Sequence, residues 1–169
     1  MGAIGQLYGT QQAMTVTNLQ SLANYATTDW AWMSARVDLT GVTAIDVLLN
    51  IHLTTANTAP ANDFAATVYL VKWYKDAGGN WRPSDLGTAT QPIATEGKGI
   101  QIVAGCNSPA VSLAYKTAQE VIDGNLSFLA DFGMSSLPHG FSVVIKNFTG
   151  AQLSTGCIVD YTPIQLSVA

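Results

Sequence analysis

Apolar and polar residues alternate most regularly over Ala44–Thr54. Ile45, Val47, Leu49, Ile51 and Leu53 share one parity, and Asp46, Leu48, Asn50, His52 and Thr54 share the other. A period of two is typical of a β-strand with one face on a core. The segment Ala65–Tyr74 is apolar or aromatic on both parities, which predicts a strand inside a sheet. Because the connector Thr55–Phe64 is rich in turn formers, we expect it to cross between sheets or to project as a loop.

Shorter segments with the same alternation recur at roughly ten-residue spacing. Trp30–Leu39 predicts a strand with Met33, Val37 and Leu39 on its core face and the two tryptophans on the other. Later candidates are Gly99–Ala104, Val111–Thr117, Leu126–Asp131, Phe141–Phe148 and Ile158–Tyr161. Pro163 limits Ile164–Val168 to an edge or terminal strand. Many short strands with little helix predict an all-β, single-domain β-sandwich, jelly-roll-like, over residues 29–169.

Residues 1–28 form a segment that is low in charge and rich in Gln, Thr, Gly and Ala. We interpret it as an extended N-terminal arm that packs on its own domain or on a neighbour. Its candidate contact residues are Leu7, Tyr8, Met14 and Leu19. A mobile terminus is the alternative, because chain ends are commonly disordered.

The charge content argues against several classes of partner. Charged residues make up only 11% of the chain, against roughly 25% in an ordinary domain. The seven basic residues are scattered and the net charge is −4, which disfavours nucleic-acid binding. No apolar run reaches the ~18 residues of a membrane span, and the first twenty residues do not resemble a signal peptide. We therefore expect synthesis and folding in a cytosol.

Residues that carry chemistry are few and form no motif. His52 lies on the polar parity of a predicted strand, and His139 follows Pro138 in a loop. Neither has metal ligands at a recognised spacing, and no nucleophile elbow is present. Cys106 and Cys157 are expected to be buried free thiols, since no export signal accompanies them. We predict a non-enzymatic protein without a cofactor or a metal.

Aromatic residues give the one binding signal in the sequence. They are Trp30, Trp32, Tyr69, Trp73, Tyr74 and Trp81. If exposed, such side chains stack on sugars or anchor a protein interface. If buried, they fill the core and rim of the sandwich. Both interpretations stay open at this point, and Trp30 and Trp32 join the candidate interface residues.

Several short segments give the chain a resemblance to virion proteins of tailed bacteriophages. They are Leu53-Thr-Thr-Ala-Asn-Thr-Ala-Pro-Ala-Asn-Asp63 with the following Val68-Tyr-Leu-Val71, then Phe141-Ser-Val-Val-Ile145 and Ile158-Val-Asp-Tyr-Thr-Pro-Ile164. The resemblance covers about residues 30–165 and carries no functional-site motif. It implies a capsid decoration, or cement, protein that bridges major capsid protein subunits on the capsid exterior as a homodimer or homotrimer. A tail or fibre component that binds carbohydrate through Trp32, Trp73 and Trp81 is the alternative.

Overall fold

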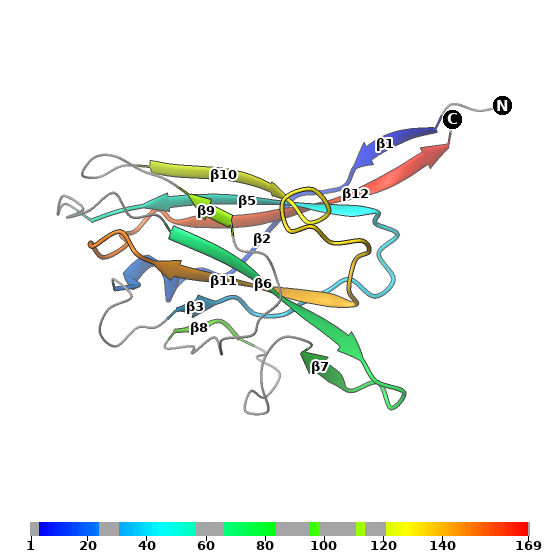
Figure 1. The fold of residues 1–169 in the computed structure, drawn as a ribbon, viewed down its shortest axis with the longest axis horizontal. Helices are drawn as coiled ribbons and strands as arrows, with labels where there is room; N and C mark the ends of the chain where they lie inside the picture. The colour runs from blue at the N-terminus through cyan, green and yellow to red at the C-terminus, as the bar shows by residue number, and fades with distance from the viewer. Residues whose placement is uncertain are drawn as a thin grey trace.

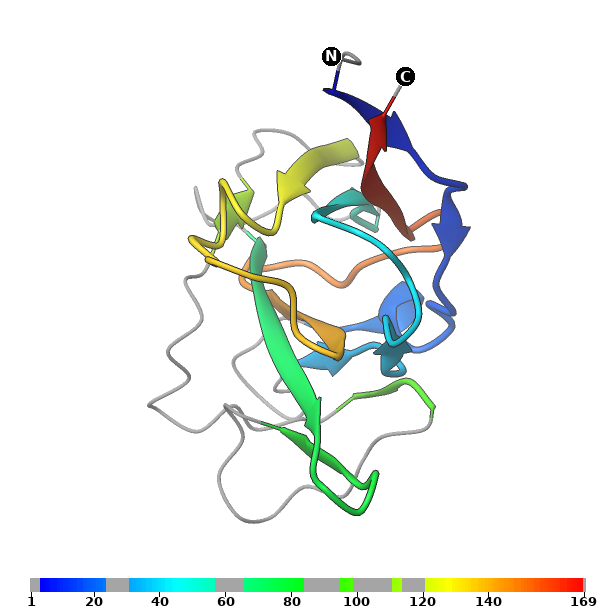
Figure 2. The ribbon, with the colours of Figure 1, turned by 90° about the vertical axis from the view of Figure 1, so that its right-hand side faces the viewer.

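The computed structural model describes residues 4–23, 31–56, 66–83, 95–98, 111–113 and 121–168. Their strands form two curved sheets packed face to face, as Figures 1 and 2 show from two directions. The predicted all-β sandwich is therefore confirmed. The chain crosses between the sheets in the jelly-roll manner from β5 to β6, from β10 to β11 and from β11 to β12. Among the described residues, no helix has the length and apolar character that a membrane span needs.

Sheet A contains the first and last strands of the chain side by side. Its order is β1 (Ile4–Tyr8), β12 (Ile158–Val168), β5 (Asp46–Thr54) and β10 (Val121–Ser127), and β2 (Gln12–Ala13) also pairs with β12. All of these pairs are antiparallel. β5 alternates between buried and half-buried residues along its whole length, which confirms the predicted strand and its core face.

Sheet B has two long strands near its centre, β6 and β11. Its order is β7 (Trp81–Pro83), β6 (Ala66–Lys75), β11 (Gly140–Asn147), β3 (Trp32–Met33) and β8 (Gly97–Lys98), while β4 (Val37–Asp38) pairs with β11 and β9 (Val111–Leu113) pairs with β6. β6 lies inside the sheet, as its apolar faces predict. The connector Thr55–Phe64 lies mostly outside the described residues, so its predicted loop is not described.

The core lies between the sheets. The largest buried side chains include Phe128, Phe132 and Phe141, whose rings make edge-to-face contacts at 4.7–6.0 Å. A second, smaller cluster contains Met33, Val71, Trp73 and Val144. On β6 and β11, the side chains of this second cluster and those of the main core point to opposite faces of the sheet. Both faces of sheet B are therefore buried there.

The segment Trp30–Leu39 differs from its prediction. It forms two short strands instead of one, and residues 34–36 between them do not belong to a strand. Trp32 belongs to the main core and Met33 to the second cluster, which reverses the two faces predicted for this part of the segment. Because irregular residues interrupt the period of two, Leu39 still reaches the main core. Trp30 lies outside the described residues.

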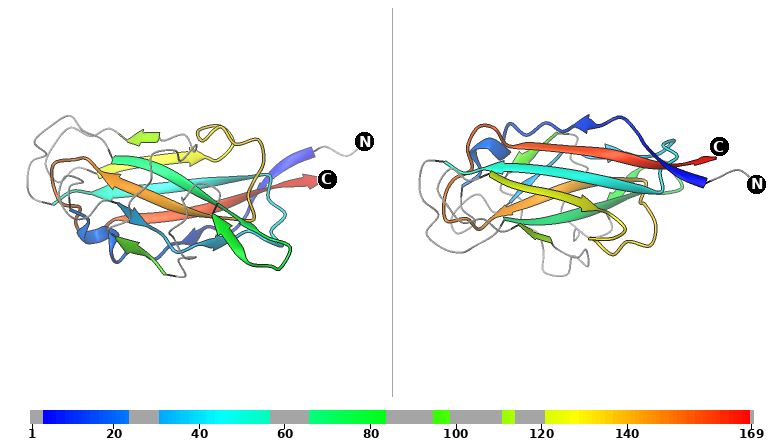
Figure 3. Two further views of the ribbon diagram at one scale, coloured as in Figure 1. Left: turned by 60° about the horizontal axis from the view of Figure 1, so that its bottom comes forward. Right: turned by 90° about the horizontal axis from the view of Figure 1, so that it is seen from above.

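β1 and the last residues of β12 form a two-stranded ribbon that projects from the sandwich, with both chain ends at its tip (Figures 1 and 3). The pairing of β12 with β5 ends at Ile164 opposite Asp46, whereas its pairing with β1 continues to Val168. We call Ile4–Tyr8 together with Gln165–Val168 the ribbon. Beyond Ile164 it lacks the support of β5.

The other described residues of the N-terminal segment, up to residue 23, pack on the sandwich. A short 3-10 helix spans Leu19–Ser21, and Leu19 and Leu22 are fully buried in the main core. Asn147 fixes this segment, because its buried amide donates hydrogen bonds to the carbonyls of Leu22 and Ala151. Within residues 4–23, the described part of the predicted arm 1–28, β1 is therefore the segment that extends from the sandwich.

Candidate functional site

The ribbon carries the three large apolar side chains with the highest exposed fractions among the described residues. Tyr8 is 61% exposed, Leu166 is 55% exposed and Leu7 is 53% exposed. Tyr8 pairs with Ile164 and Gln6 pairs with Leu166, so Tyr8 and Leu166 share the outer face of sheet A. Leu7 faces the opposite side. Exposed apolar residues gathered on one projecting element are typical of a protein interaction surface.

The ribbon also has no charged side chain. Residues 1–28 and 161–169 contain no Lys, Arg, Asp or Glu, although the whole chain carries a net charge of −4. A partner that covers the ribbon therefore desolvates no ion, and desolvation of ions is the costly part of most polar contacts. The ribbon suits recognition through buried apolar area and backbone hydrogen bonds.

The other candidate interface residues are placed differently. Leu19 and Trp32 are fully buried, so neither side chain offers surface to a partner. The indole N–H of Trp32 donates to Glu96 at 2.7 Å, which fixes the ring inside the core. Met14 is half-buried against the main core. Of the predicted contact residues, Leu7 and Tyr8 alone are exposed within the described part of the chain.

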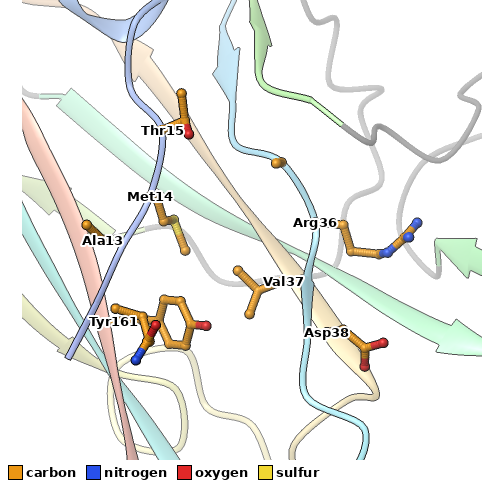
Figure 4. A pocket seen from close by; sticks show the side chains of 9 residues that line it. Ala13, Met14, Thr15, Arg36, Val37, Asp38 and Tyr161 are labelled. Atoms are coloured by element: carbon orange, nitrogen blue, oxygen red, sulfur yellow. The ribbon is translucent and has the colours of Figure 1, made fainter. Parts of the chain in front are cut away.

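Met14 lines a slot at the seam between the two sheets (Figure 4). The slot has a volume of about 330 Å³ and separates residues 12–15 from residues 35–38. Met14, Val37 and Tyr161 point into it, and the side chains of Arg36 and Asp38 point away. Burial raises the pKa of the Tyr161 hydroxyl above its ordinary value, and the ring packs edge-to-face on Phe141 at 5.4 Å. The apolar floor of this slot is part of the core packing.

Within the described residues, Trp32, Trp73 and Trp81 do not form the aromatic platform predicted for sugars. Trp32 and Trp73 are fully buried, and the indole N–H of Trp73 donates to the Ser142 hydroxyl at 3.0 Å. Trp81 is half-buried, with the guanidinium carbon of Arg36 4.3 Å and the ammonium of Lys75 4.5 Å from its ring centre. These cations occupy the ring positions on which a sugar would stack. Burial in the folded sandwich is the physical reason for the correction.

A polar groove lies on the outer face of sheet A, over β10, β5 and β12. Its volume is about 380 Å³, and its side chains are Asn50, His52, Asp123, Asn125, Ile158 and Asp160. Strand register places His52 between Asp123 and Ile158, and Asn50 between Asn125 and Asp160. The groove is lined by amides, carboxylates and one imidazole, without a basic lysine or arginine.

Hydrogen bonds hold three side chains of the groove in place. Nδ1 of His52 lies 2.6 Å from Asp123, and since an ionised carboxylate accepts only, the imidazole donates in this contact. The other ring nitrogen of His52 is then the acceptor when the ring is neutral. Asp160 accepts a hydrogen bond from the Gln11 side chain at 2.7 Å. His139 has a structural role instead, because its Nδ1 accepts from the Lys75 backbone amide.

Metal and thiol chemistry depend on how His, Cys, Asp and Glu side chains are placed. No group of three or more His, Cys, Asp or Glu side chains within the described residues has the geometry to hold a metal ion. Cys157 is a buried free thiol, as predicted, and burial raises its pKa above the ordinary value. Cys106 lies outside the described residues.

Sequence reasoning missed Leu166 and the groove. The sequence predicts an edge or terminal strand at Leu166, but its pattern does not indicate that this strand leaves the sandwich. The polar parity of β5 contains Asn50 and His52, and this signal marked a solvent face correctly. Their neighbours on β10 and β12 are more than 70 residues away in the sequence, and only the sheet register brings them together.

Comparisons with known proteins give no family. No model of a protein family matches the chain, and no curated protein matches it. Among the solved structures that match is the CBM22-1 xylan-binding domain from Paenibacillus barcinonensis Xyn10C. The match has a TM-score of 0.32 and 10% sequence identity, and covers 99% of this chain and 97% of that chain. At this similarity it does not bear on function.

Proposed function

We propose that the protein is a non-enzymatic capsid decoration protein of a tailed bacteriophage. It binds the outer capsid surface and stabilises the shell by bridging major capsid protein subunits, with the ribbon as its contact element. The observation that carries the proposal is the exposed, uncharged apolar surface of Leu7, Tyr8 and Leu166 on an element that projects from the sandwich. The choice of a phage capsid as the partner rests on the resemblance in sequence to virion proteins of tailed bacteriophages.

The chemistry of the ribbon sets what kind of contact it makes. Covering one large apolar side chain stabilises a complex by about 1.5–3 kcal/mol before the cost of association. Because the ribbon has no charge, its contact should be weakly sensitive to salt. A contact made mainly by ion pairs would weaken as salt rises.

Co-sedimentation with purified phage capsids that lack the protein tests this function. We expect saturable binding of the wild type that persists at high salt. Tyr8→Ser combined with Leu166→Ser should weaken binding at least about tenfold. Tyr74→Ser is the matched control, because Tyr74 is also exposed but lies on β6, far along the chain from the ribbon.

A truncation completes the test, and the structure sets where to cut. Removal of residues 1–28 would take Leu19 and Leu22 out of the core, so loss of binding would then reflect unfolding. Removal of residues 1–10 deletes β1 and keeps this part of the core. Absence of capsid binding by the wild type, or full binding by the 1–10 truncation, contradicts the proposal.

A second candidate function is carbohydrate binding by a phage tail or fibre component. The groove over β10, β5 and β12 favours it, since amides and carboxylates aligned beside an exposed Ile158 match the hydroxyls and the apolar face of a sugar. Binding of a panel of neutral glycans to the wild type and to Asn50→Ala with Asn125→Ala tests it. Equal or absent binding by both proteins rules it out.

A further inference from the structure

The outer edge of β1 has backbone groups without a strand partner. Among the described residues, β1 pairs with β12 alone. The Gly9 amide donates to the Pro163 carbonyl at 2.8 Å and continues the same register. Because bonded and outward-facing residues alternate in an antiparallel pair, Gln6 and Tyr8 direct their backbone groups away from β12. These groups are ready to bond to another strand.

This edge differs from the edges that β7, β8 and β10 form. β7 contains Arg82 and Pro83, β8 ends at Lys98 and β10 contains Asp123. Charge and proline on an edge prevent pairing with a foreign strand. β1 has neither, and no charged residue precedes Asp29 in the chain. An edge strand without these protections, on a two-stranded ribbon that is marginally stable in water, is suited to pairing.

We propose that β1 pairs antiparallel with β1 of a second copy of this chain, around a two-fold axis at Gln6. Gln6 then faces Gln6 of the second copy, and residue 4 lies opposite residue 8. Sheet A of one copy and sheet A of the other then form one continuous sheet. A two-fold contact uses the same patch twice, and an uncharged strand of five residues is compatible with itself in this arrangement.

The absence of charged side chains on the ribbon favours a second copy of this chain over a charged partner. Two copies with a net charge of −4 repel each other over most of their surface, but the ribbons bring no like charges together. The axis is perpendicular to the sheet, so Tyr8 and Leu166 of both copies lie on one face. The pairing thereby doubles the apolar surface. The contact is short, and we expect a dissociation constant on the order of micromolar.

Sedimentation velocity over a concentration series tests the dimer, with charge substitutions at Gln6. Gln6→Lys and Gln6→Glu each place like charges opposite one another, and each should weaken dimerisation at least about tenfold. An equimolar mixture of the two variants should restore the dimer, because Lys then faces Glu. The mixture also shows that both variants fold.

Gln165→Lys is the matched control, since Gln165 is on the ribbon but on β12 and away from the proposed axis. It should dimerise as the wild type does. A wild type that stays monomeric, Gln6→Lys that dimerises normally, or a mixture that fails to associate overturns the proposal.

The dimer is independent of capsid binding, and the two can fail separately. A monomer that binds capsids contradicts the pairing and leaves the decoration function intact. A dimer that binds no capsid contradicts the decoration function and leaves the pairing intact. If both hold, each dimer presents two ribbons, and such bivalence is what bridging of neighbouring subunits requires.

Discussion

On the outer face of sheet A, the two ends of β12 belong to two different surfaces, the groove and the ribbon. At one end, Ile158 and Asp160 of β12 line the polar groove, where β5 lies on one side of the strand. At the other end, Leu166 lies on the ribbon, where β1 is the paired neighbour. The groove contains carboxylates and an imidazole, whereas the ribbon has no charge.

This difference shows what each end can recognise. The groove lies over a packed core, so its side chains are held at fixed positions and can make directional hydrogen bonds. The ribbon has no core beneath its outer part, and its free backbone edge and apolar side chains gain from any strand or surface that covers them. The groove is therefore suited to a small polar ligand and the ribbon to a protein.

The largest expected effect contrasts the core with the ribbon. Phe141→Ala should lower the free energy of unfolding by about 3–5 kcal/mol, because the ring is fully buried against Phe128 and Tyr161. Leu7→Ala should lower it by less than about 0.5 kcal/mol, as for other exposed positions. Denaturant unfolding measures both. Equal losses would mean that the ribbon is part of the cooperative core.

The next effect concerns the anchoring of the N-terminal segment. Asn147→Ala should lower the free energy of unfolding by about 1–3 kcal/mol, because the carbonyls of Leu22 and Ala151 then lose buried donors. Asn125→Ala in the groove is the control and should change it by less than about 0.5 kcal/mol. Chemical denaturation of the two variants side by side gives the comparison. A loss at Asn147 no larger than at Asn125 would contradict the anchoring role.

Hydrogen exchange sharpens the comparison without a substitution. At low protein concentration, the β1 amides should exchange at least about tenfold faster than those of β5, because the ribbon opens without unfolding the core. At high concentration, the dimer should slow exchange at Gln6 and Tyr8 in particular, since their amides face the new partner. Mass spectrometry or NMR at both concentrations measures this. Unchanged exchange at high concentration would contradict the pairing.

The central strands could be predicted because their faces differ. The alternation in Ala44–Thr54 agrees with β5, and the apolar run Ala65–Tyr74 agrees with β6 to within one residue at each end. Such patterns depend on burial, which local sequence records directly. The faces of Trp30–Leu39 were not predictable in the same way, because the irregular residues 34–36 change which parity faces the core.

The candidate sites depend on contacts that sequence does not record. Tyr8 and Leu166 are at opposite ends of the chain, and only the β1–β12 register makes them neighbours. The sequence predicts Tyr8 and Leu19 alike as contact residues of the arm, yet Tyr8 is exposed and Leu19 is fully buried. Whether such a residue meets a core or solvent depends on where a sheet ends, and that is a property of the whole fold.

The smallest expected effect is on the pH dependence of the melting temperature, through Asp76. Backbone hydrogen bonds from Asn80 hold the pKa of Asp76 below its ordinary value, burial opposes them, and Arg82 and Gly78 add further bonds. A carboxyl with a lowered folded-state pKa stabilises the protein above its unfolded pKa of about 3.9, and this stabilisation is lost as pH falls through the folded-state value. Melting temperatures between about pH 2 and pH 7 should therefore fall less steeply for Asp76→Asn than for the wild type.

The ribbon should not follow this dependence. It contains no Asp, Glu or His. The dissociation constant of the dimer at pH 5 should therefore equal that at pH 7, provided that the protein is folded at both pH values. Sedimentation velocity at the two pH values checks this. Parallel melting curves for Asp76→Asn and the wild type would contradict the role of Asp76. A dimer lost at pH 5 would place a titrating group in the contact, and the uncharged β1 edge would then not be the surface that pairs.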